Sequence, residues 1–145
     1  MRQPAKAGPP AGHPSLRSLL LPGAVLAALC GAFYWGDPAT SRLFWPCPFH
    51  WLTGLHCPGC GAQRALHALL HGRVLEAVSA NAFAVLVVFP LAGAWFGVYA
   101  LKAAGWRRDM PMRLDLKWVI VIASVAALFG VLRNLPVYPF NWLAP

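Results

Sequence analysis

Three cysteines within a short stretch are the residues of this sequence best suited to chemistry. Cys47, Cys57 and Cys60 lie in the segment WPCPFHWLTGLHCPGCGAQR, which spans positions 45 to 64. A Cys-Pro-x-Cys-Gly turn points two thiolates at one tetrahedral ion, as zinc knuckles do. Cys47 would supply a third ligand and His50 a fourth, because these two residues repeat the spacing of the cysteine pair. The array C-x2-H-x6-C-x2-C therefore indicates a zinc site.

The same cysteines fit two other chemistries. Cys57 and Cys60 form a C-x-x-C dithiol at a helix N-terminus, where backbone N–H groups and Arg64 would favour a thiolate suited to disulfide exchange. Only Cys47 then remains outside that pair, one cysteine short of a complete relay. Alternatively, a disulfide from Cys47 to Cys57 or Cys60 would close a loop and contribute on the order of 3 kcal/mol. Spacing alone leaves the three readings open.

The composition places this cluster in a membrane protein. Hydrophobic residues make up 59% of the chain and charged residues only 11%, against about 25% charged residues in soluble domains. The net charge of +8 is spread among apolar runs and lacks the dense basic face that phosphate backbones require. We therefore expect the lipid bilayer, and no nucleic acid, as a partner.

Three apolar stretches are long enough to cross a bilayer, which takes about 20 helical residues. They cover positions 16–35, 80–101 and 114–132. The sequence thus predicts an all-α integral membrane protein with three transmembrane helices, which form one membrane domain over residues 16–145. Residues 1–15 are rich in Pro, Gly and Ala and are predicted to be a disordered cytoplasmic tail.

Loop charge predicts the orientation of the spans. The N-terminal region and the connection at 102–117 together hold eight of the twelve basic residues, so both should be cytoplasmic under the positive-inside rule. The Cys-rich segment 36–79 and the C-terminus should then face outward. Within that segment we expect a loop up to Cys60, a short helix that stops near Gly72, and a second short helix. Both helices are predicted to lie on the membrane or re-enter it.

Four polar residues are expected near the outer leaflet beside the cysteines. They are Arg64, Asn81, Arg133 and Asn134. A charged residue in an apolar setting is costly unless it is paired, so these residues are predicted to cap helix ends and carbonyls around the cysteine turn. The alternative is a small site for an anion or a lipid headgroup.

The motif C-P-x(n)-G-x-x-C-P-x-C-G-x-x-R resembles that of domain-of-unknown-function family 2752, a family of small bacterial membrane proteins. The resemblance covers roughly Trp45 to Pro145, with departures at Gln63, Arg73 and Ala82. It implies a bacterial plasma membrane location, and it brings little function because none is established for the family. Carried over residue by residue, the family pattern corresponds to the following residues of this sequence: Cys47, Pro48, Gly54, Cys57, Pro58, Cys60, Gly61, Arg64, Gly72, Asn81, Arg133 and Asn134.

Three functions remain open at this stage. The leading hypothesis is a non-enzymatic scaffold or accessory subunit with a cysteine-clamped outer hairpin, because four acidic residues leave few candidates for acid–base catalysis. The second is a membrane thiol–disulfide oxidoreductase using Cys57 and Cys60. The third is a transporter-like or lipid-binding component. Three spans make a thin wall for a pore, so that function would need a membrane protein partner or a homo-oligomer.

Overall fold

A computed structural model describes residues 16–41, 44, 46–104, 106 and 115–138 of the chain, and these residues fold without any β-strand. The predicted all-α class is therefore confirmed for them, whereas the expected disordered tail at 1–15 lies outside the described residues. The elements in chain order are η1 Leu16–Leu19, α1 Leu20–Trp35, α2 Pro48–Thr53, α3 Ala62–Leu70, α4 Val74–Phe83, η2 Ala84–Val88, α5 Phe89–Ala103 and α6 Leu116–Leu132.

Two helical stretches are long and apolar enough to cross a membrane. They run from Arg17 to Trp35 and from Val74 to Ala103. Within the most apolar 18 residues of each stretch, the structure buries 0% and 6% of the residues, respectively. A core helix of a soluble protein with this composition would be mostly buried. Leucines such as Leu21 (76% exposed) and Leu86 (67% exposed) instead give these helices an apolar outer surface, which suits lipid contact.

The second stretch differs from the expected one at 80–101. It begins at Val74 and contains a break at Asn81, where the backbone leaves helical geometry (φ −162°, ψ 93°). The π-helical stretch η2 then leads into α5. The third predicted span forms α6, a shorter apolar helix of 17 residues with no buried residue.

Helices α3 and α4 form a tight hairpin. Gly72 adopts a left-handed conformation (φ 73°), which suits glycine because it has no Cβ, and the Arg73 N–H donates to the Ala68 carbonyl at 2.8 Å. Ala65, Ala68 and Ala77 are fully buried between the helices. Small side chains let the backbones approach closely. The predicted helix with a stop at Gly72 is confirmed.

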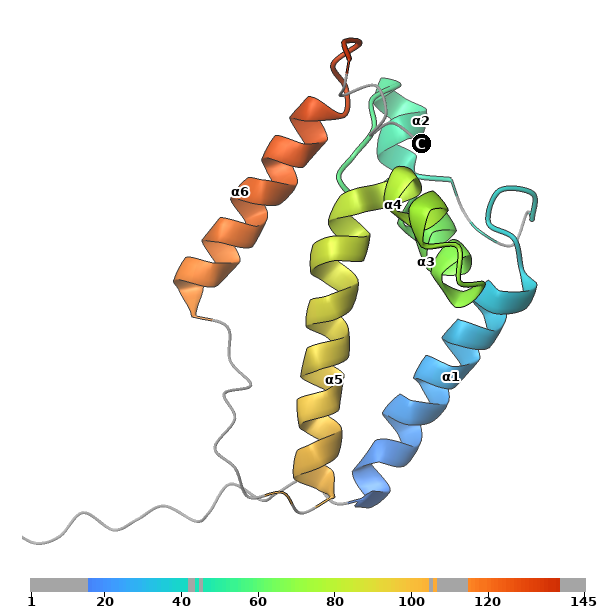
Figure 1. Ribbon diagram of the computed structural model, residues 1–145, viewed down its shortest axis with the longest axis vertical. Coiled ribbons are helices and arrows are strands. Elements are labelled where there is room, and N and C mark those ends of the chain that lie inside the picture. Colours follow the sequence, from blue (N-terminus) through green and yellow to red (C-terminus); the bar gives the residue numbers. More distant parts are fainter. Residues whose placement is uncertain (1–15, 42–43, 45, 105, 107–114, 139–145) are drawn as a thin grey trace, which may run out of the picture.

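Contacts at both ends of α1 attach it to the rest of the fold. The His67 ring on α3 contacts the Phe33 carbonyl at 2.7 Å, near the end of α1. At the opposite end, the Tyr99 hydroxyl on α5 lies 3.1 Å from the Ser18 hydroxyl. Helices α1 and α5 are thus tied together at one end directly and at the other through α3 (Figure 1).

The predicted loop between Asp37 and Cys60 is wrong in one part, because residues 48–53 form α2. Pro48 occupies the first turn, where its missing N–H costs nothing, and Gly54 ends the helix in a left-handed conformation (φ 71°). This short helix follows directly after Cys47 and directs the chain back toward the second and third cysteines.

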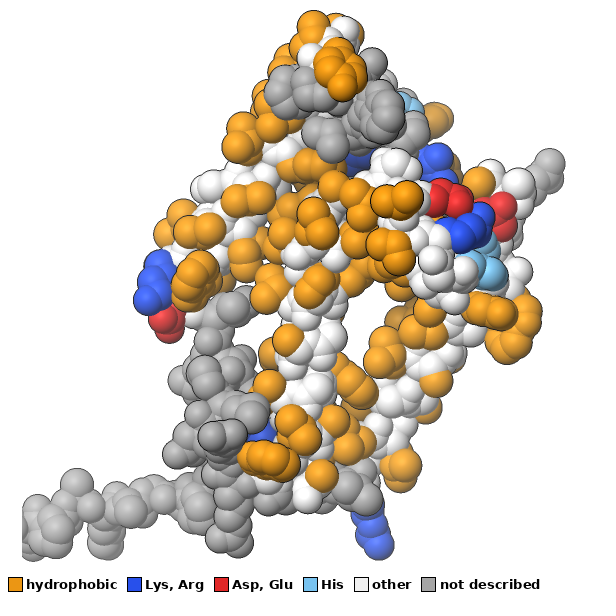
Figure 2. Space-filling model, viewed as in Figure 1, with side chains coloured by type: hydrophobic (Ala, Val, Ile, Leu, Met, Phe, Trp, Pro, Cys, Tyr) orange, Lys and Arg blue, Asp and Glu red, His pale blue; other side chains and the backbone are white. Residues whose placement is uncertain are grey.

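Helix α2 and the α3–α4 hairpin gather at one end of the long helices (Figure 1). The end of α1, the start of the α4–α5 stretch and the end of α6 all reach this end. Figure 2 shows apolar side chains along the long helices, with charged side chains concentrated over the hairpin and at the opposite helix ends. All three cysteines of the motif belong to the chain between α1 and α3.

Candidate functional site

Cys47, Cys57 and Cys60 bring their sulfur atoms together. All three sulfurs lie within 4.8 Å of one another. The Cys57 sulfur is 3.3 Å from that of Cys47 and 3.2 Å from that of Cys60. Cys30 lies in α1, outside the cluster, and all four cysteines are free thiols. The cluster can therefore hold a metal ion, and it unites the three cysteines that the motif contains.

Local backbone geometry positions the sulfurs. The Cys60 N–H donates to the Cys57 carbonyl at 3.0 Å and closes the turn. The Cys57 N–H points at the Cys60 sulfur, 3.2 Å away. Gly61 follows with φ 81° and starts α3, a backbone conformation that other residues rarely adopt. Cys47 is the N-terminal cap of α2, and Cys60 directly precedes Gly61, the N-terminal cap of α3.

Asn81 holds the Cys57–Cys60 turn in place through its side chain. Its side-chain amide is fully buried and donates to the Pro58 carbonyl at 2.8 Å and to the Cys60 carbonyl at 2.9 Å. Its side-chain oxygen accepts the Ala84 N–H at 2.8 Å. The break in the helix at Asn81 thus frees a side chain that bonds the cysteine turn and caps the next helical segment.

The end of α6 holds the turn from another side. Arg133 Nη1 donates to the Cys57 and Cys60 carbonyls, each at 3.0 Å. The Asn134 amide pairs with the His56 backbone in both directions, at 2.8 Å each. A Cβ on Gly130 would lie 3.0 Å from the Pro58 ring. The absence of a side chain there allows α6 to approach the turn.

Arg133 is the most unusual group of the site. Its side chain is 1% exposed, yet Nε and Nη2 have no hydrogen-bond partner among the described residues. The guanidinium lies over the Phe129 ring, 5.0 Å from its centroid. Burial lowers the pKa of Arg133, and negative charge on the Cys60 and Cys57 sulfurs would act against that shift. A buried cation without a counter-charge is costly, so an anion close by would stabilise this geometry.

Carboxylates do not supply that anion in the part of the chain that the structure describes. The Asp37 side chain accepts bonds from Ala39 and Thr40, next to it in the chain. Glu76 pairs with Arg73 at 3.0 Å and Asp115 with Lys117 at 3.4 Å. Asp109, the fourth acidic residue of the sequence, lies outside the described residues. Deprotonated thiols of the cysteine cluster would supply negative charge beside Arg133.

The surroundings shift the pKa values of the Cys47 and Cys60 thiols in opposite directions. The backbone N–H of His50, at the start of α2, lowers the pKa of Cys47, as helix N-termini do for cysteines. Burial raises the pKa of Cys60 to about 12, and hydrogen bonding with Cys57 and Cys47 adds to this rise. In the metal-free protein Cys47 therefore carries more thiolate than Cys60 near neutral pH.

The histidines are placed apart from the sulfurs. The His50 ring stacks on His56 at 4.5 Å, and His50 Nδ1 lies 3.2 Å from the Leu55 carbonyl. The structure does not bring His50, the expected fourth ligand, into the cysteine group. Burial lowers the pKa of His56, with further contributions from His50, Arg133 and Arg64. His67 and His71 belong to the contact between α3 and α1.

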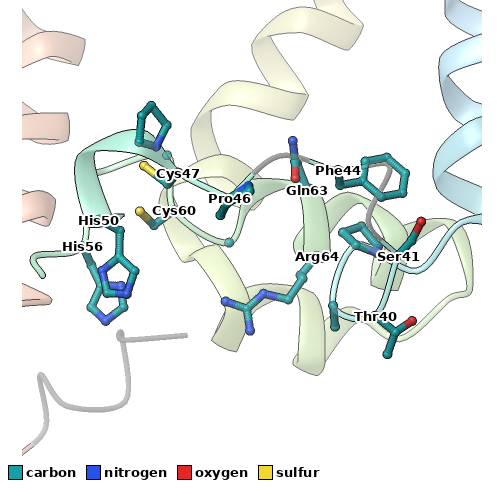
Figure 3. Close-up of a pocket in the computed structure, with 15 residues that line it drawn as sticks. Thr40, Ser41, Phe44, Pro46, Cys47, His50, His56, Cys60, Gln63 and Arg64 are labelled. Carbon is teal, nitrogen blue, oxygen red and sulfur yellow. The ribbon is translucent and has the colours of Figure 1, made fainter. Parts of the chain in front are cut away.

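A pocket of about 680 Å³ lies beside the cluster. Figure 3 shows Cys47 and Cys60 at one side of it, with the guanidinium of Arg64 extending from α3 toward the side that carries Cys60 and His56. Arg64 is exposed and bonds none of the turn carbonyls that Asn81 and Arg133 hold. The four expected polar residues therefore split: Asn81, Arg133 and Asn134 hold the backbone around the cysteines, and Arg64 lines the pocket.

The described part of the chain is thus an all-helical protein with two helices long enough to span a membrane and a three-thiol cluster at one end. A family model described as "Protein of unknown function (DUF2752)" matches residues 47–96 of the chain. The match confirms the resemblance read from the motif. It includes the three cysteines, Arg64 and Asn81, while Arg133 and Asn134 follow the matched residues. No curated protein and no solved structure matches the chain.

Sequence reasoning missed two parts of the site. One is Gly130, whose signal was a small residue one helical turn before Arg133 and Asn134. The other is the chain around Thr40 and Ser41, which lines the pocket (Figure 3). That stretch lacks a recognisable motif, so only the folded chain shows that it faces the cluster.

The role of Asn81 predicts the effect of removing its amide. An Asn81→Leu substitution keeps the volume similar but leaves the Pro58 carbonyl without its donor, and such a loss costs about 1–3 kcal/mol. We expect a lower thermal midpoint of the detergent-purified protein, followed by circular dichroism. Ser79→Ala is the matched control, because that exposed hydroxyl bonds only the Glu76 carbonyl one turn away. Equal midpoints for the two variants would contradict the role of Asn81.

Proposed function

We propose that this chain is a non-enzymatic scaffold or accessory subunit of a membrane, in which Cys47, Cys57 and Cys60 bind a zinc ion that clamps its outer hairpin. The observation that supports this proposal best is the convergence of three sulfurs within 4.8 Å. Zinc accepts three or four thiolate or imidazole ligands in this kind of turn. The ion would connect the chain before α2 with the turn that begins α3.

The sulfur separations favour a metal over a disulfide. Sulfurs bound to one tetrahedral zinc at about 2.3 Å stand roughly 3.8 Å apart, whereas bonded sulfurs stand about 2.05 Å apart. The separations of 3.3 and 3.2 Å involving Cys57 differ from the first value by about half an ångström. They differ from the second by more than an ångström. Small rotations of the side chains would therefore admit the ion.

The charge of Arg133 gives independent support. Three thiolates around one divalent ion leave one net negative charge, which a single guanidinium balances. A disulfide with one remaining neutral thiol would offer no such charge, and the buried guanidinium would remain uncompensated. Since an unpaired buried cation is strongly unfavourable, the metal-bound state accounts for Arg133 better than the stapled one.

We further propose that α6 crosses the membrane as a third span, with the N-terminus in the cytoplasm of a bacterial cell and the cysteine cluster outside the plasma membrane. The basic residues of the sequence support this orientation. Arg17 and Lys102 lie at the start of α1 and the end of α5, which is the end away from the cluster (Figure 1).

Reporter fusions in bacterial cells test this topology. Alkaline phosphatase fused to the C-terminus of the full chain should be active and a fluorescent protein fused there dark, because the first folds outside the cytoplasm and the second inside it. The same reporters on a chain ending at Trp106, between α5 and α6, should give the opposite pair of results. Identical results at both fusion points would show that α6 does not cross the membrane.

A second candidate function is thiol–disulfide exchange, and the central position of Cys57 favours it. Its sulfur lies close to both other sulfurs. A Cys47 thiolate attacking the Cys57 sulfur of a 57–60 disulfide would form a 47–57 disulfide and release Cys60 as a thiolate. Net oxidation or reduction would then require an external dithiol or disulfide.

Metal analysis of the purified protein separates the two functions. We expect about one zinc per chain and no disulfide in the wild-type protein. Cys57→Ser should lose more zinc affinity than the about 10–100-fold that loss of an outer-shell partner costs, because it removes the central ligand itself. Cys30→Ser is the matched control and should retain the metal, since Cys30 lies in α1 outside the cluster. A metal-free protein with a 57–60 disulfide that mild dithiols reduce would instead establish the exchange enzyme.

A further inference from the structure

The chain supplies three sulfurs to an ion that prefers four ligands, so the fourth coordination position must be filled from elsewhere. Zinc sites with three protein ligands keep an open position for water or another small ligand. His50 is turned to His56 and the Leu55 carbonyl and stands outside the cysteine group. Among the described residues, the structure brings no other histidine or acidic side chain to the sulfurs.

The open side of the cluster faces the pocket. Cys47 and Cys60 both line it, so a ligand in the pocket can reach the ion directly (Figure 3). Asn81 and Arg133 bond the carbonyls of the turn, and Cys57 lines a second cavity beside α6. The buried guanidinium of Arg133, with two unsatisfied nitrogens, is an observation independent of the cysteines that calls for an anionic cluster.

Arg64 gives the pocket a positive charge. Its side chain lines the same pocket and is exposed. No ion pair in the described part of the chain includes it, since the two pairs found there join Arg73 to Glu76 and Lys117 to Asp115. Two guanidinium groups thus flank one sulfur cluster. Three thiolates and one divalent ion carry a net charge of minus one, which balances the positive charge of only one guanidinium.

We infer that the pocket binds a small anion whose donor atom occupies the fourth position of the metal, with Arg64 balancing its charge. This inference rests on the proposed metal centre and extends it, because the clamp then acts as a receptor for an anionic ligand. A bound anion brings the net charge of the centre to minus two, which Arg133 and Arg64 together neutralise. The exposed position of Arg64 allows the ligand to enter and leave, whereas Arg133 is fixed in the interior.

Cobalt substitution of the full-length protein in detergent tests the inference. Cobalt bound by thiolates has visible absorption that reports its ligands, and inorganic azide is the probe anion. We expect a saturable change of the spectrum on azide addition. Arg64→Gln should weaken azide binding about tenfold, which corresponds to about 1.4 kcal/mol, and Arg64→Lys should restore part of it. Arg73→Gln is the matched control and should bind azide like the wild type.

The outcomes separate the two proposals. A cobalt spectrum with thiolate bands that azide does not alter would overturn the inference and leave the metal centre intact. His50→Ala would then alter the spectrum before any azide is added, if that ring closes the fourth position. Absence of thiolate–cobalt bands in the wild-type protein would overturn the metal centre itself. Equal azide binding by wild-type protein and Arg64→Gln would remove Arg64 from the site.

Discussion

The carbonyl groups of the Cys57–Cys60 turn accept hydrogen bonds from side chains that are distant in the sequence, and Cys60 itself is buried. A buried carbonyl left without its donor costs about 1–3 kcal/mol. Asn81 and Arg133 donate to these carbonyls from two different helical segments. The turn therefore has one favourable position, and that position fixes two of the three sulfurs. The third sulfur arrives with Cys47 at the start of α2.

The same hydrogen bonds organise the long apolar helices. Asn81 has non-helical dihedral angles, so α4 ends its regular path there and can fold back on α3 while α5 continues along the bundle (Figure 1). Gly130 and Asn134 bring α6 against Pro58 and His56. Helix α6 is thus joined to the rest of the described chain mainly through the cysteine turn. A metal ion at the sulfurs would strengthen a junction on which three helices depend.

Much of the architecture could be predicted from the sequence because it follows from local patterns. Apolar length gave the long helices, and the glycine at position 72 gave the end of α3. The spacing of the cysteines indicated a cluster, and the sulfurs do converge. The start of the second long stretch at Val74 was missed, because the short helix before Asn81 continues into α5 instead of standing apart from it.

The different structural roles of the polar residues could not be predicted from the sequence. Arg64 and Arg133 both stood out in the sequence as cations near the outer leaflet. The fold buries Arg133 against the turn, because the end of α6 approaches Cys57, and it leaves Arg64 in the pocket. His50 has the right spacing for a ligand, yet the stacking with His56 directs its ring elsewhere. Spacing along a chain fixes which residues are near, and tertiary contacts decide where they point.

X-ray absorption at the zinc edge of the protein as purified from its membrane tests the central claim most directly. A centre built from Cys47, Cys57 and Cys60 should show three sulfur neighbours at about 2.3 Å and one lighter donor near 2.0 Å. Cys57→Ser should lose the sulfur shell together with the zinc. A zinc-free wild-type protein, or zinc surrounded by oxygen and nitrogen alone, would contradict the account.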